Sequence, residues 1–262
     1  MTDTLLHGLV DDAGLFPPTA LPMRDALARN AKDRAARDPM LTQRFLVPTE
    51  LLDELLGLLP EGSGIELGLI HAGSGAELLD ALARAEGRVR HVELKGAAAL
   101  SDVPDDLPVY VEPLRFDALP GVIEAVRSAG RIGPTGVKVR CGGIRADLFP
   151  TVDQLAEALR AVVSASLPMK ATAGLHSAIR NTNPETGFEH HGFLNLLTAI
   201  DAALSGGDVA AVLAERDPAR VAEAIRAMDE DRRRAVRHVL VSYGSCSTSS
   251  PVQQAARLGL RP

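Results

Sequence analysis

Apolar and polar residues alternate along four short segments in the middle of the chain. Because successive side chains of a β-strand point to opposite faces, this pattern predicts strands with one apolar and one polar face. Two of the polar faces carry a lysine at the second position of the segment, Lys138 in one segment and Lys170 in another. The four segments are 92–95, 109–112, 137–141 and 169–173.

Strand and helix patterns alternate along the whole chain, with no apparent linker or residue-level repeat. Capping-box spacing supports helix starts at Ser74–Glu77 and Thr151–Gln154. The predicted strands are 5–10, 44–47, 65–70, 88–95, 108–113, 136–141, 168–173 and 239–243. The predicted helices are 22–37, 50–59, 76–86, 119–129, 152–165, 193–215, 218–236 and a short helix beginning near Ser250.

Strands that alternate with helices pair in parallel, which leaves an open doubly wound sheet or a closed barrel. Central strands of a doubly wound sheet are almost continuously apolar, whereas these strands are apolar on one face only. A closed barrel with helices around its wall and a polar lumen fits both this pattern and a length of 262 residues. We therefore predict one α/β domain over 1–262, a (β/α)8 TIM barrel with extra helices before the last strand.

Composition narrows the class of protein. Hydrophobic residues make up 46% of the chain, enough for a sizeable core, while aromatic residues make up only 3% and the net charge is −6. Nucleic-acid binding needs basic surface and often aromatic stacking platforms, so we expect no such partner. No apolar run approaches the roughly 18 residues of a membrane span, and the first residues do not resemble a signal peptide. Two cysteines make no disulfide framework, so we expect a reduced cytoplasmic protein without membrane contact.

If the apolar faces pack against helices, the polar side chains of the later strands point into the lumen. Four of these side chains are basic and two are acidic, and the excess positive charge favours a phosphate or carboxylate ligand. The alternative is a structural network of ion pairs, although buried ion pairs seldom contribute much stability. The predicted inward residues are His91, Glu93, Lys95, Tyr110, Glu112, Lys138, Arg140, Lys170, Thr172 and Ser242.

Lys138 and Lys170 support the most specific hypothesis. On neighbouring strands each ammonium group would disfavour the charge on the other, and burial would lower both pKa values further. A lysine held neutral in this way attacks a carbonyl carbon and forms a Schiff base, whose iminium group is an electron sink. Glu93, Glu112 and Tyr110 are then candidates for moving protons. The alternative is that each lysine only binds a substrate anion.

A family resemblance points to the same chemistry. Residues 136–145, Gly-Val-Lys-Val-Arg-Cys-Gly-Gly-Ile-Arg, resemble the Lys-x-x-Gly-Gly-Ile-Arg segment of deoxyribose-phosphate aldolase, with one extra residue before the glycines. Residues 170–174, Lys-Ala-Thr-Ala-Gly, are similar to the second lysine segment of that family, Lys-Thr-Ser-Thr-Gly. In these class I aldolases the Schiff-base lysine lies on strand six and the second lysine on strand seven. By position, the resemblance implies that Lys138 is the nucleophile and Lys170 its neighbour.

Two loops add candidate binding residues. Gly244 and Ser245 follow the last strand, where small residues and a helix start expose backbone N–H groups that suit a phosphate. An ordinary Ser-rich turn is the alternative. The loop 174–192 is longer than a barrel turn needs and is typical of a lid. It contains His176, the candidate for acid/base chemistry or ligand binding, whereas we expect the pair 190–191 to be solvated.

Metal binding and thiol chemistry are less favoured. His176 and other His and Asp residues at the predicted barrel mouth offer ligands for a divalent metal, but no metal-ligand spacing is present. We therefore expect no cofactor and keep a divalent metal as the alternative. Cys246 has no partner implied by spacing, and we interpret it as a small packed residue.

These observations predict a cofactor-independent lyase or aldolase that forms a Schiff base with a small anionic carbonyl metabolite, a keto acid or a sugar phosphate. Lys138 would be the nucleophile, with Lys170, Glu93, Glu112 and Lys95 around it. An isomerase or epimerase that uses the carboxylates for proton transfer is one alternative, and a non-catalytic metabolite-binding barrel is another. Assembly into a homo-oligomer is left open. The candidate substrate-binding residues are Arg140, Thr172, His176, Tyr110, Gly244 and Ser245.

Overall fold

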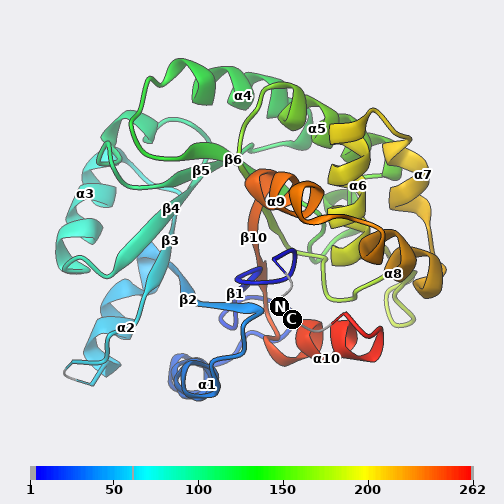
Figure 1. The fold of residues 1–262 in the computed structure, drawn as a ribbon. Coiled ribbons are helices and arrows are strands. Elements are labelled where there is room, and N and C mark those ends of the chain that lie inside the picture. The colour runs from blue at the N-terminus through cyan, green and yellow to red at the C-terminus, as the bar shows by residue number, and fades with distance from the viewer. Residues whose placement is uncertain (1–3, 61, 261–262) are drawn as a thin grey trace.

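The computed structural model describes residues 4–60 and 62–260, in which eight parallel strands close into a barrel surrounded by helices (Figure 1). Around the barrel the strands follow the order β1-β10-β7-β6-β5-β4-β3-β2. Strands that are neighbours in the chain therefore also pair in space, except that the short two-stranded sheet of β8 (Asn181–Thr182) and β9 (Glu189–His190) lies between β7 and β10 in the chain and outside the barrel. This is the predicted TIM-barrel class of fold. The barrel strands are β1 (Val10–Asp12), β2 (Leu41–Pro48), β3 (Leu67–His71), β4 (Val89–Lys95), β5 (Val109–Glu112), β6 (Thr135–Arg140), β7 (Met169–Thr172) and β10 (Leu240–Ser245).

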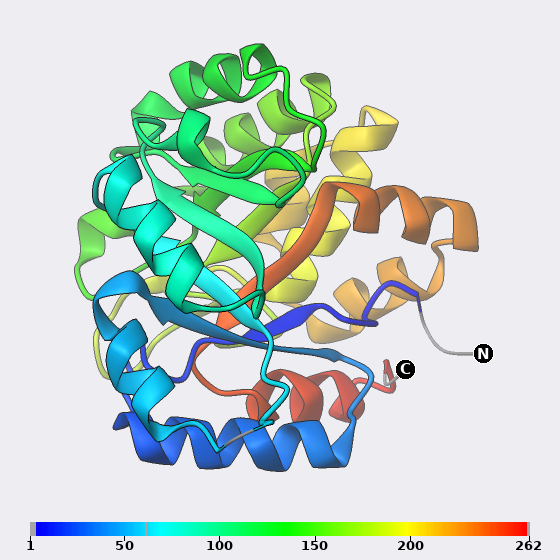
Figure 2. The ribbon, with the colours of Figure 1, turned by 90° about the vertical axis from the view of Figure 1, so that its left-hand side faces the viewer.

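The helices form the outer layer, and α10 lies beside α1 (Figures 1 and 2). Their bounds are α1 (Met23–Ala36), α2 (Leu52–Leu58), α3 (Gly75–Arg84), α4 (Leu119–Ser128), α5 (Val152–Ser164), α6 (Phe193–Ser205), α7 (Val209–Ala214), α8 (Pro218–Arg226), α9 (Glu230–Val239) and α10 (Ser249–Arg257). Short 3-10 helices cover Thr49–Leu51, Leu100–Asp102, Phe116–Ala118 and Ala146–Leu148. The predicted capping boxes are confirmed at Ser74 and Thr151.

The apolar faces of the strands point outward, as the alternation predicts. Val137 and Val139 of β6 belong to the buried hydrophobic core, together with Met169 and Ala171 of β7. Burial of these side chains against helices supplies the main favourable contribution to folding. The polar side chains between them therefore enter the lumen of the barrel.

Extra helices precede the last barrel strand, as expected, but each long predicted helix is divided. The segment 193–215 forms α6 and α7, because Gly206 adopts a left-handed conformation with φ 73° that ends α6. The segment 218–236 forms α8 and α9, and the side chain of Asp229 caps the second helix. Helix α6 is buried because α5, α7, α8 and α9 pack against it.

The start of the predicted first strand, which was placed around 5–10 and ended by Asp11 and Asp12, is wrong. Leu5 and Leu6 lie in a turn and Leu9 lies in the irregular segment after it; all three are buried in the core, and β1 covers only Val10–Asp12. An apolar run next to the chain start satisfies the local strand pattern, but pairing with β2 and β10 fixes the strand further along. Asp11 therefore lies within a barrel strand, with its side chain in the lumen.

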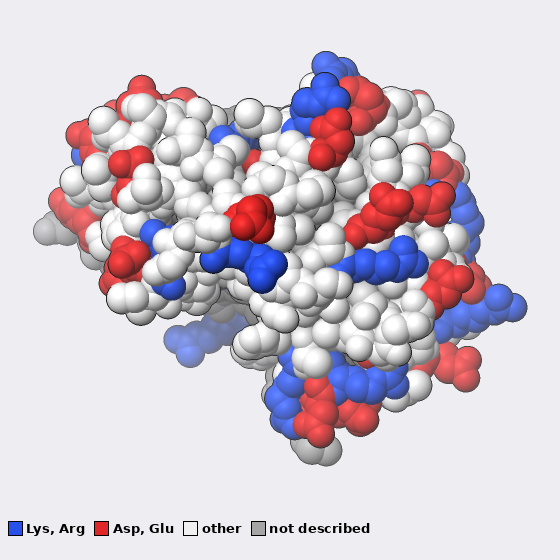
Figure 3. All heavy atoms as spheres, turned by 90° about the horizontal axis from the view of Figure 1, so that it is seen from above, with Lys and Arg blue, Asp and Glu red and all other residues white. Residues whose placement is uncertain are grey.

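On the face that Figure 3 shows, acidic and basic side chains are interspersed, with uncharged areas between them. Among the described residues, no helix has the length and apolar character needed to cross a membrane.

Candidate active site

Lys138 and Lys170 lie directly opposite each other on β6 and β7. Lys138 is 3% exposed and Lys170 is 1% exposed, so both amines are enclosed in the lumen. Lys138 Nζ lies 2.7 Å from Glu93 Oε2 and 2.9 Å from Glu112 Oε2. The predicted enclosure of both lysines and both carboxylates is present in the structure.

Lys170 is held by a second set of partners. Its Nζ donates to Asp11 Oδ2 and, over 2.8 Å, to Ser242 Oγ, and lies 3.3 Å from Glu93 Oε1. Ser242 Oγ in turn donates to Asp11 Oδ2 over 2.6 Å. The ammonium group also lies 5.8 Å from the ring centre of Tyr110. Lys170 is thus surrounded by buried partners, whereas Glu112, a partner of Lys138, also lines a surface pocket.

Glu93 lies between the two lysines, and this position affects the charge of Lys138. Burial disfavours the ammonium form of Lys138, but the carboxylates of Glu93 and Glu112 outweigh burial and raise its pKa. Burial likewise disfavours the carboxylate of Glu93, but Lys138 and Lys170 outweigh it and hold the Glu93 pKa well below its usual value. The expected neutral Lys138 is therefore wrong for the protein without a ligand, because a carboxylate lies between the amines.

Two charged residues of the lumen, Asp11 and Arg44, were absent from the predicted inward set. Arg44 Nε donates to Asp11 Oδ1 over 2.9 Å, and Arg44 also donates to Ser242 Oγ over 3.2 Å. Arg44 alternates with Phe45 and Val47, so the same strand rule would have found it. Asp11 was predicted to end the first strand and to be a possible metal ligand there, but not to meet the lysines in the lumen.

The net charge of the lysine centre, which is the buried group formed by Lys138, Lys170 and the charged side chains around them, changes accordingly. Four cationic side chains meet three carboxylates, which leaves one excess positive charge instead of the predicted two. The cationic residues are Arg44, Lys138, Arg140 and Lys170, and the acidic residues are Asp11, Glu93 and Glu112. His91 adds no charge near neutral pH, because burial and Lys170 lower its pKa to about 4. The remaining positive charge still favours an anionic ligand.

His91 and Tyr110 complete the polar lining. His91 Nε2 lies 3.0 Å from Glu93 Oε1, and its ring meets Tyr110 edge to face. Gly68 on β3 makes room for this ring, since a Cβ there would lie 2.4 Å from a His91 carbon. Burial raises the pKa of Tyr110 to about 12, so its hydroxyl stays protonated.

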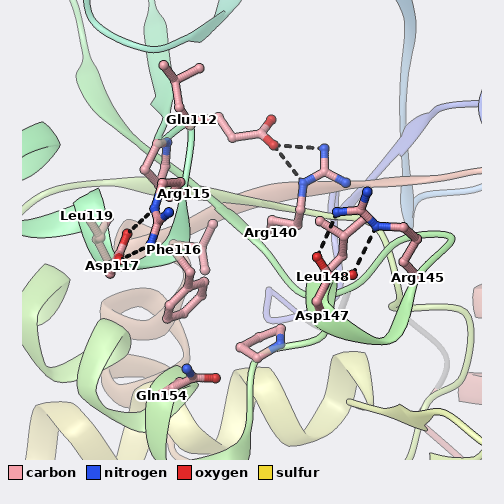
Figure 4. Close-up of a pocket in the computed structure, with 14 residues that line it drawn as sticks. Glu112, Arg115, Phe116, Asp117, Leu119, Arg140, Arg145, Asp147, Leu148 and Gln154 are labelled. Carbon is pink, nitrogen blue, oxygen red and sulfur yellow. Dashed lines mark hydrogen bonds and ion pairs between the residues drawn. The ribbon is translucent and has the colours of Figure 1, made fainter.

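Arg140 links the lysine centre to a surface pocket. Its Nε and Nη2 both lie 2.8 Å from Glu112 Oε1, and its Nη1 donates to the carbonyl of Gly142 over 3.2 Å. Arg140 and Glu112 line a pocket of about 530 Å³ between the loops that follow β5 and β6 (Figure 4). A volume of this size suits a small-molecule ligand. Glu112 therefore contacts Lys138 inside and the pocket outside.

Other predicted site residues lie at the ends of their strands. Lys95 is exposed at the end of β4, and Thr172 is half-buried at the end of β7, opposite Arg140 in register. Gly244 pairs with Asp11 and Thr172 in register. Ser245 is buried, and its hydroxyl donates to the carbonyl of Ser247 over 2.7 Å. Among the described residues, none forms an ion pair with Lys95.

The long loop 174–192 is ordered by its own contacts. It contains the two-stranded sheet of β8 (Asn181–Thr182) and β9 (Glu189–His190). The expected solvation of 190–191 is wrong, because both histidines are buried. The His190 ring packs on Phe149, and His191 Nε2 lies 2.8 Å from the carbonyl of Pro150. The loop thereby contacts the β6–α5 connection.

Cys246 has a partner that spacing did not reveal. Its Sγ lies 3.5 Å from His176 Nδ1, which comes from the loop after β7. Burial lowers the pKa of His176, so the imidazole is neutral near pH 7. The pair places a thiol and an imidazole together in the loops that follow β7 and β10.

We expect iodoacetamide to label Cys246 in the folded protein before Cys141. Cys141 is fully buried, and burial raises its pKa to about 12, whereas Cys246 is 6% exposed and contacts an imidazole. Thiolate fraction and access control alkylation. Peptide mass spectrometry of a labelling time course measures both sites, and His176→Ala should slow labelling of Cys246. Equal labelling rates for the two cysteines would contradict this assignment.

Three potential metal ligands also meet in the lumen. One donor atom each from Asp11, His91 and Glu93 lies within 4.8 Å of the others. However, the ammonium group of Lys170 contacts both carboxylates and already supplies a positive charge between them. The group includes Asp11, which was among the predicted ligands, but not His176, which was the favoured one. A cation here would have to displace Lys170.

A comparison of the chain with models of known families, with curated proteins and with solved structures finds no match. The assignment of a function therefore rests on the fold and on the geometry of the lysine centre.

Proposed function

We propose that this barrel is a cofactor-independent lyase of the class I aldolase type, which forms a Schiff base between Lys138 and a small anionic carbonyl compound. The observation that supports the proposal best is the enclosed pair of lysines joined by one carboxylate. Glu93 contacts both ammonium groups, at 2.7 Å and 3.3 Å. Buried ion networks seldom repay their desolvation in stability, which favours a catalytic reason for this one.

Lys138 is the better nucleophile of the two lysines. Its partner Glu112 lines the pocket, so a carbonyl group entering there meets Lys138 first. Lys170 is enclosed by Asp11, Ser242 and Glu93 and acts as the neighbouring charge. The position on β6 also agrees with the resemblance to deoxyribose-phosphate aldolase.

Schiff-base formation requires Lys138 to lose two of its three protons. They leave with the carbonyl oxygen as water, and the nitrogen keeps one proton in the iminium group. Glu93 and Glu112 lie within 2.9 Å of the amine and are placed to relay these protons. Because the Lys138 pKa is raised and the Glu93 pKa is lowered, the first transfer is uphill and must draw on substrate binding.

Borohydride trapping tests the proposal. Wild-type protein is incubated with a panel of 2-oxo acids and sugar phosphates, reduced, and mapped by peptide mass spectrometry. We expect a stable adduct at Lys138, lost in Lys138→Met and in Lys138→Arg, which preserves the positive charge. Lys32→Met on the exposed face of α1 is the matched control. Absence of an adduct across the panel would overturn the Schiff-base mechanism.

An isomerase or epimerase is the second candidate, and one observation favours it. Burial disfavours the carboxylate of Glu112, but Lys138 and Arg140 outweigh it and lower its pKa, so an ionised carboxylate borders the pocket. A carboxylate in this position can abstract a proton beside a carbonyl group. Exchange of substrate hydrogen with deuterated solvent, without an adduct at Lys138, would favour this candidate over the lyase. Binding with neither exchange nor adduct would favour a non-catalytic barrel.

A further inference from the structure

Two loops with the same arrangement of residues line the pocket beside the lysine centre, a repeat that the sequence did not make apparent. We call these loops, which follow β5 and β6, the twin loops. Each loop has an aliphatic residue, an arginine, an aspartate and a proline at positions 1, 2, 4 and 7. The residues are Leu114, Arg115, Asp117 and Pro120 after β5, and Ile144, Arg145, Asp147 and Pro150 after β6. Each loop then forms one short 3-10 helix.

Within each loop the arginine forms an ion pair with the aspartate through two hydrogen bonds. Arg115 donates to the two carboxylate oxygens of Asp117 over 3.1 and 2.7 Å. Arg145 donates to Asp147 over 3.0 and 2.7 Å in the same arrangement (Figure 4). With Arg140 on Glu112, every charge that lines the pocket has an opposite partner within it. The pocket therefore has no unpaired charge to offer a ligand.

Apart from Gln154, whose Oε1 accepts from the backbone N–H of Thr151, the rest of the lining is apolar. Phe116 and Leu119 contribute from the first loop and helix, and Leu148 contributes from the second loop. Val139, which points away from the lumen, also lines the pocket. Because Glu112 and Arg140 line it too, the pocket runs from the edge of the lysine centre outward between α4 and α5.

From this division of charge we infer that the substrate is a 2-oxo acid with an apolar or aromatic side chain, and that the pocket between the twin loops binds this side chain. The inference rests on the proposed function, in that the carbonyl and carboxylate groups lie toward the lysine centre, where one positive charge is in excess. A sugar phosphate would instead place most of its hydroxyl groups against paired charges and apolar carbons, with Gln154 as the one uncharged polar side chain of the lining, so it would lose hydrogen bonds to water with little replacement.

A probe without a carbonyl group separates this inference from the Schiff-base mechanism. We compare the binding of 4-phenylbutanoate and butanoate by isothermal titration calorimetry. The phenyl compound should bind roughly tenfold tighter or more, because it buries an apolar ring. Leu148→Trp, which fills the pocket, should abolish this advantage. Ile132→Trp is the matched control, because Ile132 is 85% exposed in the loop that precedes β6, at the other end of that strand.

The outcomes are distinct. Equal binding of the two acids by wild type, or an advantage that survives Leu148→Trp, would overturn the inference even if borohydride traps an adduct. Pocket binding of the phenyl compound without any trapped adduct would leave the inference standing and overturn the Schiff-base mechanism. Where trapping succeeds, 4-phenyl-2-oxobutanoate should give more adduct than 2-oxobutanoate in wild type, and Leu148→Trp should remove the difference.

Discussion

Glu93→Gln is expected to lower the free energy of unfolding by about 3–5 kcal/mol, because removing one partner of a buried ion pair leaves an uncompensated charge. Glu93 is 1% exposed and contacts the ammonium groups of Lys138 and Lys170. Glutamine retains the shape and hydrogen-bonding capacity of the side chain but removes the charge. Urea denaturation at pH 7, followed by circular dichroism, measures the difference.

Glu66→Gln provides the matched control. Glu66 and Arg90 form an ion pair of 2.9 Å in which both side chains are nearly half exposed. Exposed pairs contribute roughly 0–1 kcal/mol, so this variant should stay close to wild type. If Glu93→Gln costs no more than Glu66→Gln, the lysines are neutral in the folded protein and the charge assignment of the centre is wrong.

The barrel could be predicted from the sequence because its main signal is local. Alternation along 137–141 and 169–173 identifies the wall-facing and lumen-facing positions without knowledge of which strands pair. Eight such strands, with helices between them, leave few topologies. The first strand could not be placed in this way, because Leu5 and Leu6 satisfy an apolar pattern in a turn, and only pairing with β10 selects Val10–Asp12.

The same rule predicts which side chains share the lumen but not how they pair. It brought Glu93, Lys138 and Lys170 together, yet the charge of Lys138 depends on where Glu93 lies between the amines. That position follows from the stagger of the strands around the closed barrel, which is a property of the whole fold. Asp11 and Lys170 are 159 residues apart in sequence, so no local pattern connects them.

Loop residues were the least predictable. His190 and His191 look like a solvated pair in a polar segment, but the loop folds back on the β6–α5 connection and buries them. The contact between Cys246 and His176 likewise joins loops from two strands. Tertiary contacts of this kind decide loop structure. The arginine and aspartate shared by the loops after β5 and β6 recur at the same spacing in the sequence, but four matching positions in seven do not stand out as a repeat until the pocket brings the two loops together.

Unfolding should become easier as the pH falls from 7 toward 4, and His91 should contribute strongly. Burial lowers its folded-state pKa from 6.5 to about 4, and Lys170 adds to this effect. Below pH 6.5 the unfolded chain takes up a proton that the folded protein does not, so stability is lost until the pH reaches about 4. A difference of this size corresponds to about 3 kcal/mol.

The carboxylates of the centre act in the same direction at lower pH. Burial disfavours ionisation of Asp11 and Glu93, but the neighbouring cations outweigh burial and lower both pKa values. Their contribution is therefore present above the usual pKa values of 3.8 and 4.5 and is lost as the pH falls below them. The decline should thus continue below pH 4, where His91 no longer contributes.

Urea denaturation of wild type and His91→Gln at a series of pH values separates the two ranges. The variant should lack the His91 share of the decline between pH 6.5 and 4, while the decline below that range remains because Asp11 and Glu93 are intact. His7→Gln, at an exposed position near the chain start, is the control and should follow wild type. If His91→Gln also follows wild type across the upper range, the buried imidazole is not held neutral, and Lys170 does not act on it as a nearby positive charge.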